Sequence, residues 1–449
     1  MQTGFVEETA PKTKILEGVT WYHWLVVIIA SGGWLFDCMD QRLFILARQP
    51  ALRELLAGDA VALENINSYL GWATTSMILG WATGGIIFGM MSDKVGRVKT
   101  MVVTLLVYSS FTGFSGIAQS WVDFTIYRFM VGLGVGGMFG AATTLVAESV
   151  PSRFRAVALG SLQALSAMGN ILGSMISLGI KPGGTAVLGD FSGWRVLFFV
   201  GILPALLVVP IIFVLKEPEA WTKAKMAAKA GHTEKHVGSA RDLFVDPRWR
   251  RNSIVGLLLG VSGMIGLWGI GFFSPELISA ALKGSPPEQV DTVRGWGTAL
   301  QDAGAFLGMV TFTAVASIVS RRAAFLGAFV ACFFVTIFVF NSLKTATDAY
   351  WMLPMMGFAQ LAVFAGYSIY FPELFPTRLR GTGVGFCYNT VRYLAAPFPT
   401  LMGFLATNVF SGFADPFRTS AMVMASVYLI GAVSLIWAPE IKGKPLPEG

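Results

Sequence analysis

Charged side chains are scarce in this sequence of 449 residues. They make up 13% of the chain, whereas 54% of the residues are hydrophobic and the mean hydropathy is +0.63. A soluble domain carries about 25% charged residues, so this chain lacks the polar groups to cover a surface exposed to water. The apolar residues are spread along the whole chain, which argues against a soluble catalytic domain on a membrane stalk. The composition predicts an integral membrane protein.

Cysteine and histidine are also rare, with three residues of each. Each cysteine lies in an apolar stretch, which excludes a disulfide framework and a paired-thiol metal motif. His232 and His236 have the spacing of helical metal ligands, but no third ligand is recognisable, so we predict no metal site. His23 is the only histidine near an apolar segment, and no nucleophile–base pair is visible. We therefore expect neither an enzyme nor a cofactor.

Twelve apolar segments are long enough to cross a membrane, which takes about 20 residues at a rise of 1.5 Å each. They are 21–47, 68–91, 100–119, 122–148, 156–180, 194–215, 252–281, 291–318, 323–342, 347–371, 381–407 and 416–438. A long polar stretch separates the first six from the last six. We expect an all-α membrane protein with a six-helix bundle over 1–215, a cytosolic linker over 216–251 and a second six-helix bundle over 252–449.

The basic residues predict how the chain is oriented. With the N-terminus inside, 22 Lys and Arg fall in cytosolic segments and eight in outer segments. Loops rich in Lys and Arg stay in the cytosol, so we expect both termini inside the cytoplasmic (inner) membrane. The net charge of +7 is not gathered into one basic face with interleaved aromatics, which argues against nucleic acid. We expect a monomer in the lipid bilayer.

Two matching segments indicate an internal repeat. Glu148-Ser-Val-Pro-Ser-Arg-Phe-Arg155 follows the fourth segment and Glu373-Leu-Phe-Pro-Thr-Arg-Leu-Arg380 follows the tenth, at an offset of 225 residues. Parallel halves of this kind leave a central cavity, which is the geometry of a transporter. We interpret the charged residues of both segments as gating latches, with simple helix-end punctuation as the alternative. These residues are Glu148, Arg153, Arg155, Glu373, Arg378 and Arg380.

Two further motifs carry a family resemblance. Gly89-Met-Met-Ser-Asp93-Lys-Val-Gly-Arg97-Val-Lys99 resembles the loop signature of the major facilitator superfamily, from which it departs at Lys94 and Val98. The resemblance implies that Asp93 and Arg97 form part of the gate. The stretch from Arg128 to Gly137 is similar to the Arg-plus-glycine helix of that family. It contains a G-x-G-x-x-G pattern, but inside an apolar helix these glycines predict close helix packing rather than a nucleotide site.

The first apolar segment indicates which branch of this family the sequence resembles. Phe36-Asp37-Cys38-Met39-Asp40 looks like the D-G-x-D element of aromatic-acid and sialate proton symporters, with Cys38 in place of glycine. The stretch from Pro372 to Arg392 also resembles the organic-acid branch. This implies uptake of a small organic anion, such as a monocarboxylate, aromatic acid or sugar acid, together with protons. Proton-coupled transport of a neutral sugar, export, and a non-transporting membrane sensor are the alternatives.

Charges inside the membrane need a reason, because one at the bilayer centre costs about 2.5–3.5 kcal/mol on insertion scales. Asp37 lies thirteen residues beyond Trp24, roughly 20 Å deep. Arg128 lies in the outer half, where Asp37 or Asp40 can meet it. We predict that these three residues and Asp302 take part in proton coupling, with structural pairing or helix-end anchoring as the alternative.

Arg392 reaches roughly 16 Å into the eleventh segment with no carboxylate close in sequence. A guanidinium group binds a carboxylate through two parallel hydrogen bonds, so we predict that Arg392 binds the anionic substrate. The alternative is an ion pair with Asp302. Seven polar residues can line the same cavity if they converge, and otherwise join helices: Gln163, Asn170, Gln301, Gln360, Tyr367, Tyr388 and Asn389.

Overall fold

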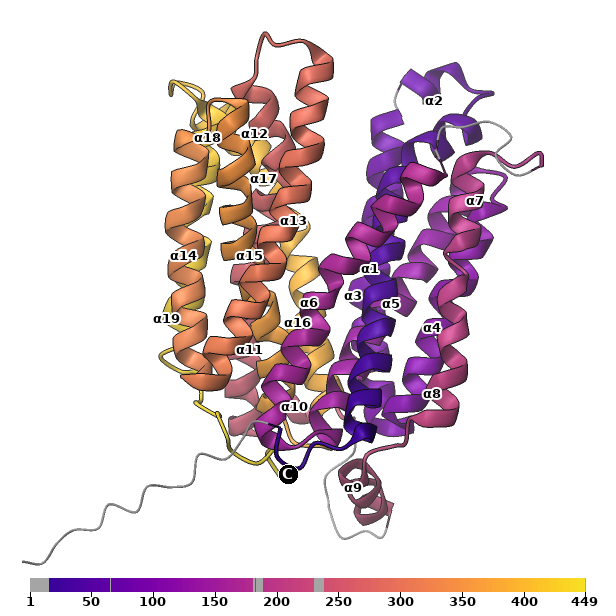
Figure 1. Ribbon diagram of the computed structural model, residues 1–449, viewed down its shortest axis with the longest axis vertical. Helices are drawn as coiled ribbons and strands as arrows, with labels where there is room; N and C mark the ends of the chain where they lie inside the picture. Colours follow the sequence, from indigo (N-terminus) through magenta and orange to yellow (C-terminus); the bar gives the residue numbers. More distant parts are fainter. Residues whose placement is uncertain (1–15, 65, 181, 183–188, 230–237, 449) are drawn as a thin grey trace, which may run out of the picture.

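A computed structural model describes residues 16–64, 66–180, 182, 189–229 and 238–448. The regular elements of these residues are all helices. Two groups of helices pack against each other at one end of the molecule and diverge towards the other (Figure 1). His232 and His236, discussed above as an unlikely pair of metal ligands, lie outside the described residues.

The first group contains α1 (Trp21–Leu55), α2 (Ala60–Glu64), α3 (Ile66–Val95), α4 (Arg97–Gly116), α5 (Trp121–Ser149), α6 (Ser152–Gly179), α7 (Gly193–Val200), the 3-10 helix η1 (Leu203–Leu207) and α8 (Val208–Val214). Two helices follow between the groups, α9 (Glu219–Lys229) and α10 (Asp242–Val245).

The second group begins with α11 (Pro247–Ile265), the π-helix η2 (Gly266–Ile270), the 3-10 helix η3 (Gly271–Phe273) and α12 (Ser274–Ala281). It continues with α13 (Pro287–Ile318), α14 (Arg321–Ser342), α15 (Ala346–Leu374), α16 (Arg380–Ala395), α17 (Phe398–Phe404), the π-helix η4 (Leu405–Val409), α18 (Pro416–Met424) and α19 (Val427–Ser434).

Eleven helical stretches of the described chain are long and apolar enough to cross a membrane. They fall on eleven of the twelve predicted segments, so the prediction of an all-helical membrane protein is confirmed. The other segment, 381–407, is divided between α16, α17 and η4, and the break falls at Ala396 and Pro397. Proline has no backbone N–H to continue the helical hydrogen bonds. The count of twelve spans stays a prediction.

Glycines allow neighbouring helix backbones to touch. A Cβ atom added to Gly132 or Gly136 of α5 would lie 2.1 Å from the carbonyl oxygen of Met77 or Trp81 on α3. In the second group, a Cβ on Gly304 of α13 would lie 2.0 Å from a carbonyl oxygen of α15. The predicted packing role of the glycines in the G-x-G-x-x-G pattern is therefore confirmed.

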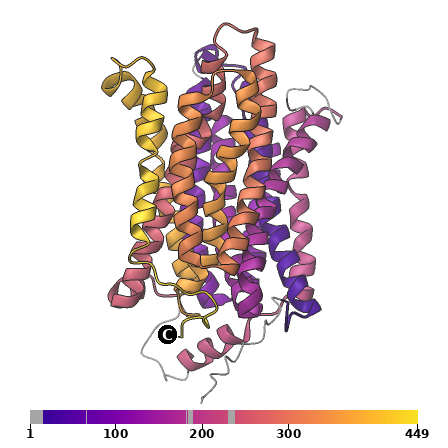
Figure 2. The same cartoon turned by 60° about the vertical axis from the view of Figure 1, so that its left-hand side comes forward.

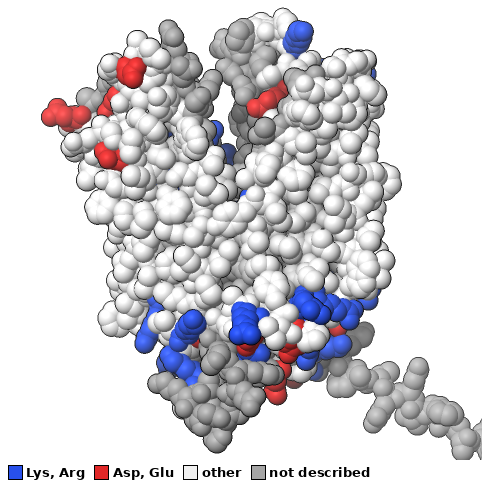
Figure 3. Space-filling view, turned by 180° about the vertical axis from the view of Figure 1, so that it is seen from behind, with Lys and Arg blue, Asp and Glu red and all other residues white. Residues whose placement is uncertain are grey.

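The two ends of the molecule differ in charge and shape. Lys and Arg side chains gather at the end where the helix groups meet, which we call the basic end (Figure 3). The C-terminal residues and α9 lie there as well (Figure 1). At the opposite end, the open end, the space-filling surface is hollowed between the two groups (Figure 3). The molecule therefore has a gap that is open on one side and closed at the basic end.

Candidate functional site

Arg392 on α16 is a buried cation between the two helix groups. Its side chain is 4% exposed, and its guanidinium carbon lies 3.8 Å from the ring centroid of Trp81 on α3 and 4.9 Å from that of Tyr388. One terminal nitrogen lies 3.5 Å from the sulfur of Met264, and Nε has no hydrogen-bond partner. Among the ion pairs of the described residues, none includes Arg392. Two aromatic faces hold the cation in place without neutralising it.

The neighbours of Arg392 on α16 also contact the first helix group. The ring of Tyr388 stacks on that of Phe139 of α5, with centroids 4.0 Å apart. Asn389 lies against α3, where a Cβ added to Gly85 would be 1.9 Å from its amide nitrogen. That nitrogen donates to the Gly385 carbonyl oxygen (3.1 Å), while the amide oxygen is buried without a partner. The structure thus brings Tyr388, Asn389 and Arg392 together at the contact between the groups.

Asp302 does not pair with Arg392, so that alternative is wrong. Its carboxylate instead accepts a hydrogen bond from Arg42 of α1, with 2.9 Å between Oδ2 and Nη2. This ion pair joins α13 to α1 and therefore links the two groups. Its side chains are 26% and 25% exposed, so it is more accessible than Arg392. Arg42 is close enough in space to satisfy Asp302 although the two are distant in sequence.

Asp40, rather than Asp37, lies next to Arg128. Its Oδ1 accepts from the Thr112 hydroxyl (2.8 Å), and its Oδ2 lies 3.8 Å from Arg128 Nη1. Arg128 Nε donates to the Ser115 hydroxyl at 3.1 Å. All of these groups lie inside the first helix group. Three aromatic rings surround the guanidinium, at 4.6–5.8 Å: Phe44, Phe124 and Phe198.

Asp37 is fully buried one helical turn from Asp40. Neither of its oxygens has a hydrogen bond of good geometry in the described part of the chain, although the Tyr108 hydroxyl and the Asp40 carboxylate are close enough to interact with it. Cys38, beside it on α1, is within electrostatic range of both Arg392 and Arg42. Asp37 itself belongs to no ion pair within the described residues.

Two of the predicted cavity residues use their polar groups inside the second helix group. The Tyr367 hydroxyl donates to the Leu259 carbonyl oxygen at 2.7 Å. The Gln360 amide nitrogen donates to the Thr336 hydroxyl at 3.2 Å, and its amide oxygen has no partner. Only the ring of Tyr367 approaches the site, with its centroid 6.4 Å from that of Tyr388. The structure does not bring these two donors to Arg392.

The remaining predicted cavity residues lie on α6 and α13. Gln163 and Gln301 are buried, and the amide oxygen of Gln163 has no partner. Asn170 is half-buried on the same helix as Gln163. Their helices touch across the two groups, since a Cβ added to Gly160 would lie 1.9 Å from the Thr313 hydroxyl. These residues therefore share the interface between the groups, but no described contact joins them to Arg392.

An ion-pair network closes the basic end. Arg97 lies 3.0 Å from Asp93 and binds Glu148 through two nitrogens at 3.0 and 3.1 Å. Glu148 also accepts a hydrogen bond from Arg380 of α16, in the other helix group. The side chains of all four residues are completely buried. The network therefore ties α3, α4 and α5 to α16.

Asp93 makes a second link by capping α16. One carboxylate oxygen accepts from the backbone N–H of Gly381 at 3.0 Å, and the other accepts from the N–H and hydroxyl of Thr382 at 2.8 and 2.7 Å. Free N–H groups at the start of a helix favour a negative charge. A carboxylate of the first group thus satisfies a helix of the second.

A related network surrounds Glu373 in the second group. Arg321 donates to both of its oxygens at 3.1 Å, and Arg155 of the first group lies 3.8 Å away. Arg155 Nε also donates to the carbonyl oxygen eight residues earlier at 2.9 Å, as Arg380 Nε does in its own helix group. These contacts repeat those around Glu148, with Glu373 and Arg380 at the offset of 225 residues from Glu148 and Arg155.

Two predicted latch residues lie outside the buried networks. Arg153 is 51% exposed and pairs with Glu17 at 3.2 Å. Arg378 is buried and binds Asp242 of α10 at 2.6 Å, so it fastens the segment between the groups to the start of α16.

Several residues of the sites were missed by sequence reasoning. Trp81 stacks on Arg392, and Arg321 is the main partner of Glu373. Glu217 accepts from the backbone N–H of Arg97 at 2.7 Å, and Trp221 donates to the Asp93 carbonyl oxygen at 2.7 Å. Only Arg321 could have been found from the sequence. It follows the eighth apolar segment as Arg97 follows the second, at an offset one residue shorter than that of the repeat.

The chain is similar to known proteins over most of its length. Residues 35–398 match the family model described as Major Facilitator Superfamily. The chain is 30% identical over 359 residues to the cis,cis-muconate transport protein of Acinetobacter baylyi, which covers 80% of this chain and 82% of that protein. It is 29% identical over 307 residues to the sialic acid transporter NanX of Escherichia coli, over 67% of this chain and 69% of the transporter.

The fold is shared with a solved structure. The proton:xylose symporter XylE, bound to 6-bromo-6-deoxy-D-glucose, superposes with a TM-score of 0.76 at 18% sequence identity, covering 95% of this chain and 98% of that chain.

Proposed function

Because the chain belongs to the Major Facilitator Superfamily, we propose that it imports a small organic anion together with protons. The family consists of transporters, so the protein is a membrane transporter and not an enzyme. The observation that carries the proposal is Arg392, a buried guanidinium between the two helix groups with no carboxylate partner among the described residues. A buried cation without a counter-ion is costly. An anionic substrate would supply the missing charge.

The surroundings of Arg392 favour a carboxylate as the ligand. A guanidinium group binds a carboxylate through two parallel hydrogen bonds. Because Nε of Arg392 has no hydrogen-bond partner, it can donate to a ligand without breaking an existing bond. Trp81 and Tyr388 pack on the guanidinium and hold it in place for such a ligand. The relative from Acinetobacter baylyi is named for transport of cis,cis-muconate, which is an organic acid. Monocarboxylates, aromatic acids and sugar acids are the proposed substrate class.

The proposed architecture is two six-helix bundles over 1–215 and 252–449, joined by the linker 216–251. It rests on the repeated networks around Glu148 and Glu373, and on counting α16, α17 and η4 together as a twelfth span. The basic end faces the cytosol by the distribution of Lys and Arg, with both termini there and the chain in the inner membrane as a monomer. The structure is then an outward-open state of an alternating-access cycle.

Asp37 is the proposed proton site. It is a fully buried carboxylate that makes no hydrogen bond of good geometry among the described residues, whereas Asp40 has Thr112 and Arg128 as partners. Asp302 and Arg42 form a more exposed pair across the gap and are proposed to assist coupling. Movement of the two bundles would change the distance between such charges and with it their affinity for protons.

Binding to the purified carrier tests the anion site. Thermal-shift or calorimetric titration with cis,cis-muconate, benzoate, sialic acid and neutral xylose should identify an acid that binds. Arg392→Lys should then weaken binding of that acid roughly 10- to 150-fold, because a hydrogen bond to a charged group contributes about 1.5–3 kcal/mol. The point charge of lysine cannot reproduce the two parallel hydrogen bonds of a guanidinium group.

The matched control is Arg418→Lys, since Arg418 pairs with Asp415 in the same helix group. It should leave the affinity unchanged. Unchanged affinity in Arg392→Lys, or binding of xylose alone, would refute the proposed anion site.

A further inference from the structure

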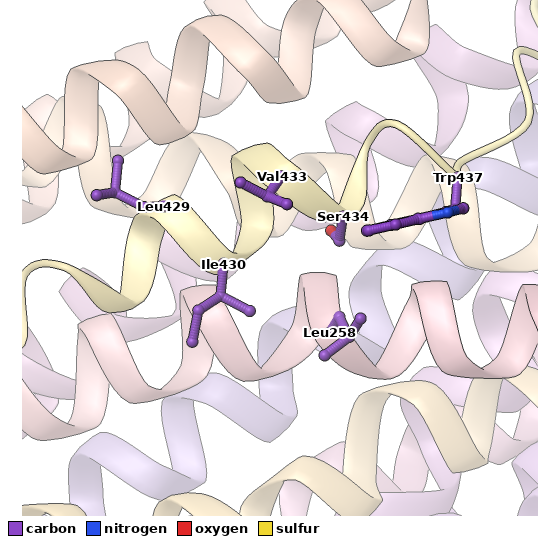
Figure 4. Close-up of a pocket in the computed structure, with 6 residues that line it drawn as sticks. All are labelled: Leu258, Leu429, Ile430, Val433, Ser434 and Trp437. Carbon is purple, nitrogen blue, oxygen red and sulfur yellow. The ribbon is translucent and has the colours of Figure 1, made fainter.

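An apolar groove lies on the outer surface of the second helix group. It runs between α11 and α19 and has a volume of about 330 Å³ (Figure 4). The helix α19 is at the edge of the molecule, as the yellow helix in Figure 2 shows. The groove therefore faces the surrounding membrane rather than the gap between the helix groups. It is lined by Leu258, Leu429, Ile430, Val433, Ser434 and Trp437.

Unpaired arginines lie at the basic end of this groove. Arg251 Nε donates to the Trp437 carbonyl oxygen at 3.2 Å, which places the guanidinium next to the lining. Arg250 precedes it and is exposed, as is Arg251. Within the described parts of the chain, neither belongs to an ion pair. Leu258 lies seven residues beyond Arg251 on α11, so the two share one face of the helix.

The acidic groups nearby are already engaged. Glu440 accepts hydrogen bonds from the backbone N–H groups of Arg321 and Arg322 at 3.2 and 3.1 Å. Asp246 caps the start of α11 by accepting from the N–H of Arg248 at 2.9 Å. Both carboxylates keep their charge but are held by backbone N–H groups, so they leave the guanidinium groups of Arg250 and Arg251 free to bind a ligand.

We propose that this groove binds an anionic phospholipid, with one acyl chain along α11 and α19 and the phosphate on Arg250 and Arg251. Charge and position both support this ligand. Basic side chains at the cytosolic edge of the membrane attract anionic headgroups, and the amphipathic ring of Trp437 suits the interface between chain and headgroup.

The groove and the arginines contribute differently. A lipid tail gains little hydrophobic energy by moving from the bilayer into an apolar groove, because both surroundings are equally apolar. The groove therefore fixes the position of the chain by van der Waals contact. The arginines select a negative headgroup over a zwitterionic one. This site is independent of the transported solute and of Arg392.

Native mass spectrometry of the full-length carrier tests the site with two probes, dioleoylphosphatidylglycerol and dioleoylphosphatidylcholine. The wild-type protein should retain one phosphatidylglycerol molecule in preference to phosphatidylcholine. Arg250→Gln combined with Arg251→Gln should reduce that preference roughly tenfold or more. Val433→Trp keeps the charges and fills the groove, so it should lower retention of the same lipid to a similar degree.

Matched controls separate the site from general effects. Lys344→Gln removes an exposed positive charge at the other end of the molecule, and Val423→Trp enlarges an exposed side chain on α18. Both should retain phosphatidylglycerol as the wild type does. Equal retention of the two lipids by the wild type, or full retention of phosphatidylglycerol by both the double variant and Val433→Trp, would overturn the proposal.

Discussion

Asp37 places a carboxylate inside α1 where the fold makes no direct use of it. Neither oxygen makes a hydrogen bond of good geometry among the described residues, and the side chain is fully buried. A buried carboxylate is energetically costly in a membrane, and residues of this kind mark functional sites. Asp40, one turn away, differs because Thr112 and Arg128 satisfy it.

We predict that Asp37→Asn abolishes uphill accumulation driven by a proton gradient but retains exchange of substrate across the membrane. The amide has nearly the same shape but cannot carry the proton. Accumulation and counterflow in proteoliposomes measure the two activities separately. Glu219→Gln, on the exposed helix α9, should behave as the wild type; full accumulation by Asp37→Asn would remove its coupling role.

Glu54 provides a pH-dependent contact at the end of α1. Burial raises the pKa of its carboxyl, but hydrogen bonds from Trp194, Ser192 and Arg195 outweigh that effect and hold the pKa below its ordinary value. Trp194 Nε1 donates to it at 2.6 Å. A lowered pKa stabilises the folded state above the unfolded pKa of about 4.3, and this contribution is lost as the pH falls through the folded value.

The Tm of Glu54→Gln should therefore fall less between pH 6 and pH 3 than the Tm of the wild-type protein. Scanning fluorimetry at a series of pH values measures this, with Glu219→Gln as the control. An identical acid-induced fall in all three proteins would show that the Glu54 contact does not affect stability.

At the level of single residues, sequence reasoning located charges but not their partners. Helical rise placed Arg128 at a depth where it can meet Asp37 or Asp40, and the structure selects Asp40. Arg42 lies in the first apolar segment, but nothing in the sequence pairs it with Asp302, since the two are 260 residues apart. Trp81 carries no signal that distinguishes it from a lipid-facing tryptophan. Partners across helices depend on rotations that a single sequence does not fix.

Among the helices, the crossing of α3 and α16 joins the two groups most closely. A Cβ atom added to Gly385 would lie 2.3 Å from the Gly85 carbonyl oxygen, and one added to Gly89 would lie 2.7 Å from that of Gly381. These contacts are backbone to backbone, so an added methyl group has no flexible side chain to displace. The glycines allow the basic end to close.

We predict that Gly385→Ala shifts the carrier away from this closed arrangement of the basic end. Overpacking costs about 1–3 kcal/mol, or roughly 5- to 150-fold in the ratio of the two states. Spin labels at the exposed positions 94 and 322 should report longer distances. Gly327→Ala is the control, because nothing lies within 4 Å of its added Cβ. Unchanged distances in Gly385→Ala would contradict the prediction.

Hydropathy located the helices well because lipid demands long apolar runs with internally satisfied backbones. It did not anticipate the division of 381–407, although Pro397 is the residue where the helix is interrupted. The start of α11 also differs: it begins at Pro247, inside the segment predicted as the linker. There the side chain of Asp246 caps the helix, and this local contact allows the helix to start within a polar stretch of sequence.

For the whole molecule, the two ion-pair networks at the basic end differ in how strongly they join the groups. Glu148 binds Arg380 of the other group directly, whereas Glu373 lies 3.8 Å from Arg155 and is held mainly by Arg321 of its own group. Removing one partner of a buried ion pair costs about 3–5 kcal/mol.

Glu148→Gln should therefore open the basic end more than Glu373→Gln does. The same spin-label pair at 94 and 322 measures the opening, and Glu219→Gln should leave the distances unchanged. Equal opening by both variants, or greater opening by Glu373→Gln, would show that the two networks contribute alike.

Asp93 makes the two bundles unequal partners. It caps α16, whereas Ser317, which stands 224 residues later as Arg321 does relative to Arg97, donates to the Thr313 carbonyl oxygen of its own helix. The carrier without its cargo thus gains a stabilising contact on one side of its cycle that the repeat does not reproduce. This contact lowers the free energy of the state that is closed at the basic end and open at the other. In the orientation proposed above, that state presents its binding site to the outside of the cell.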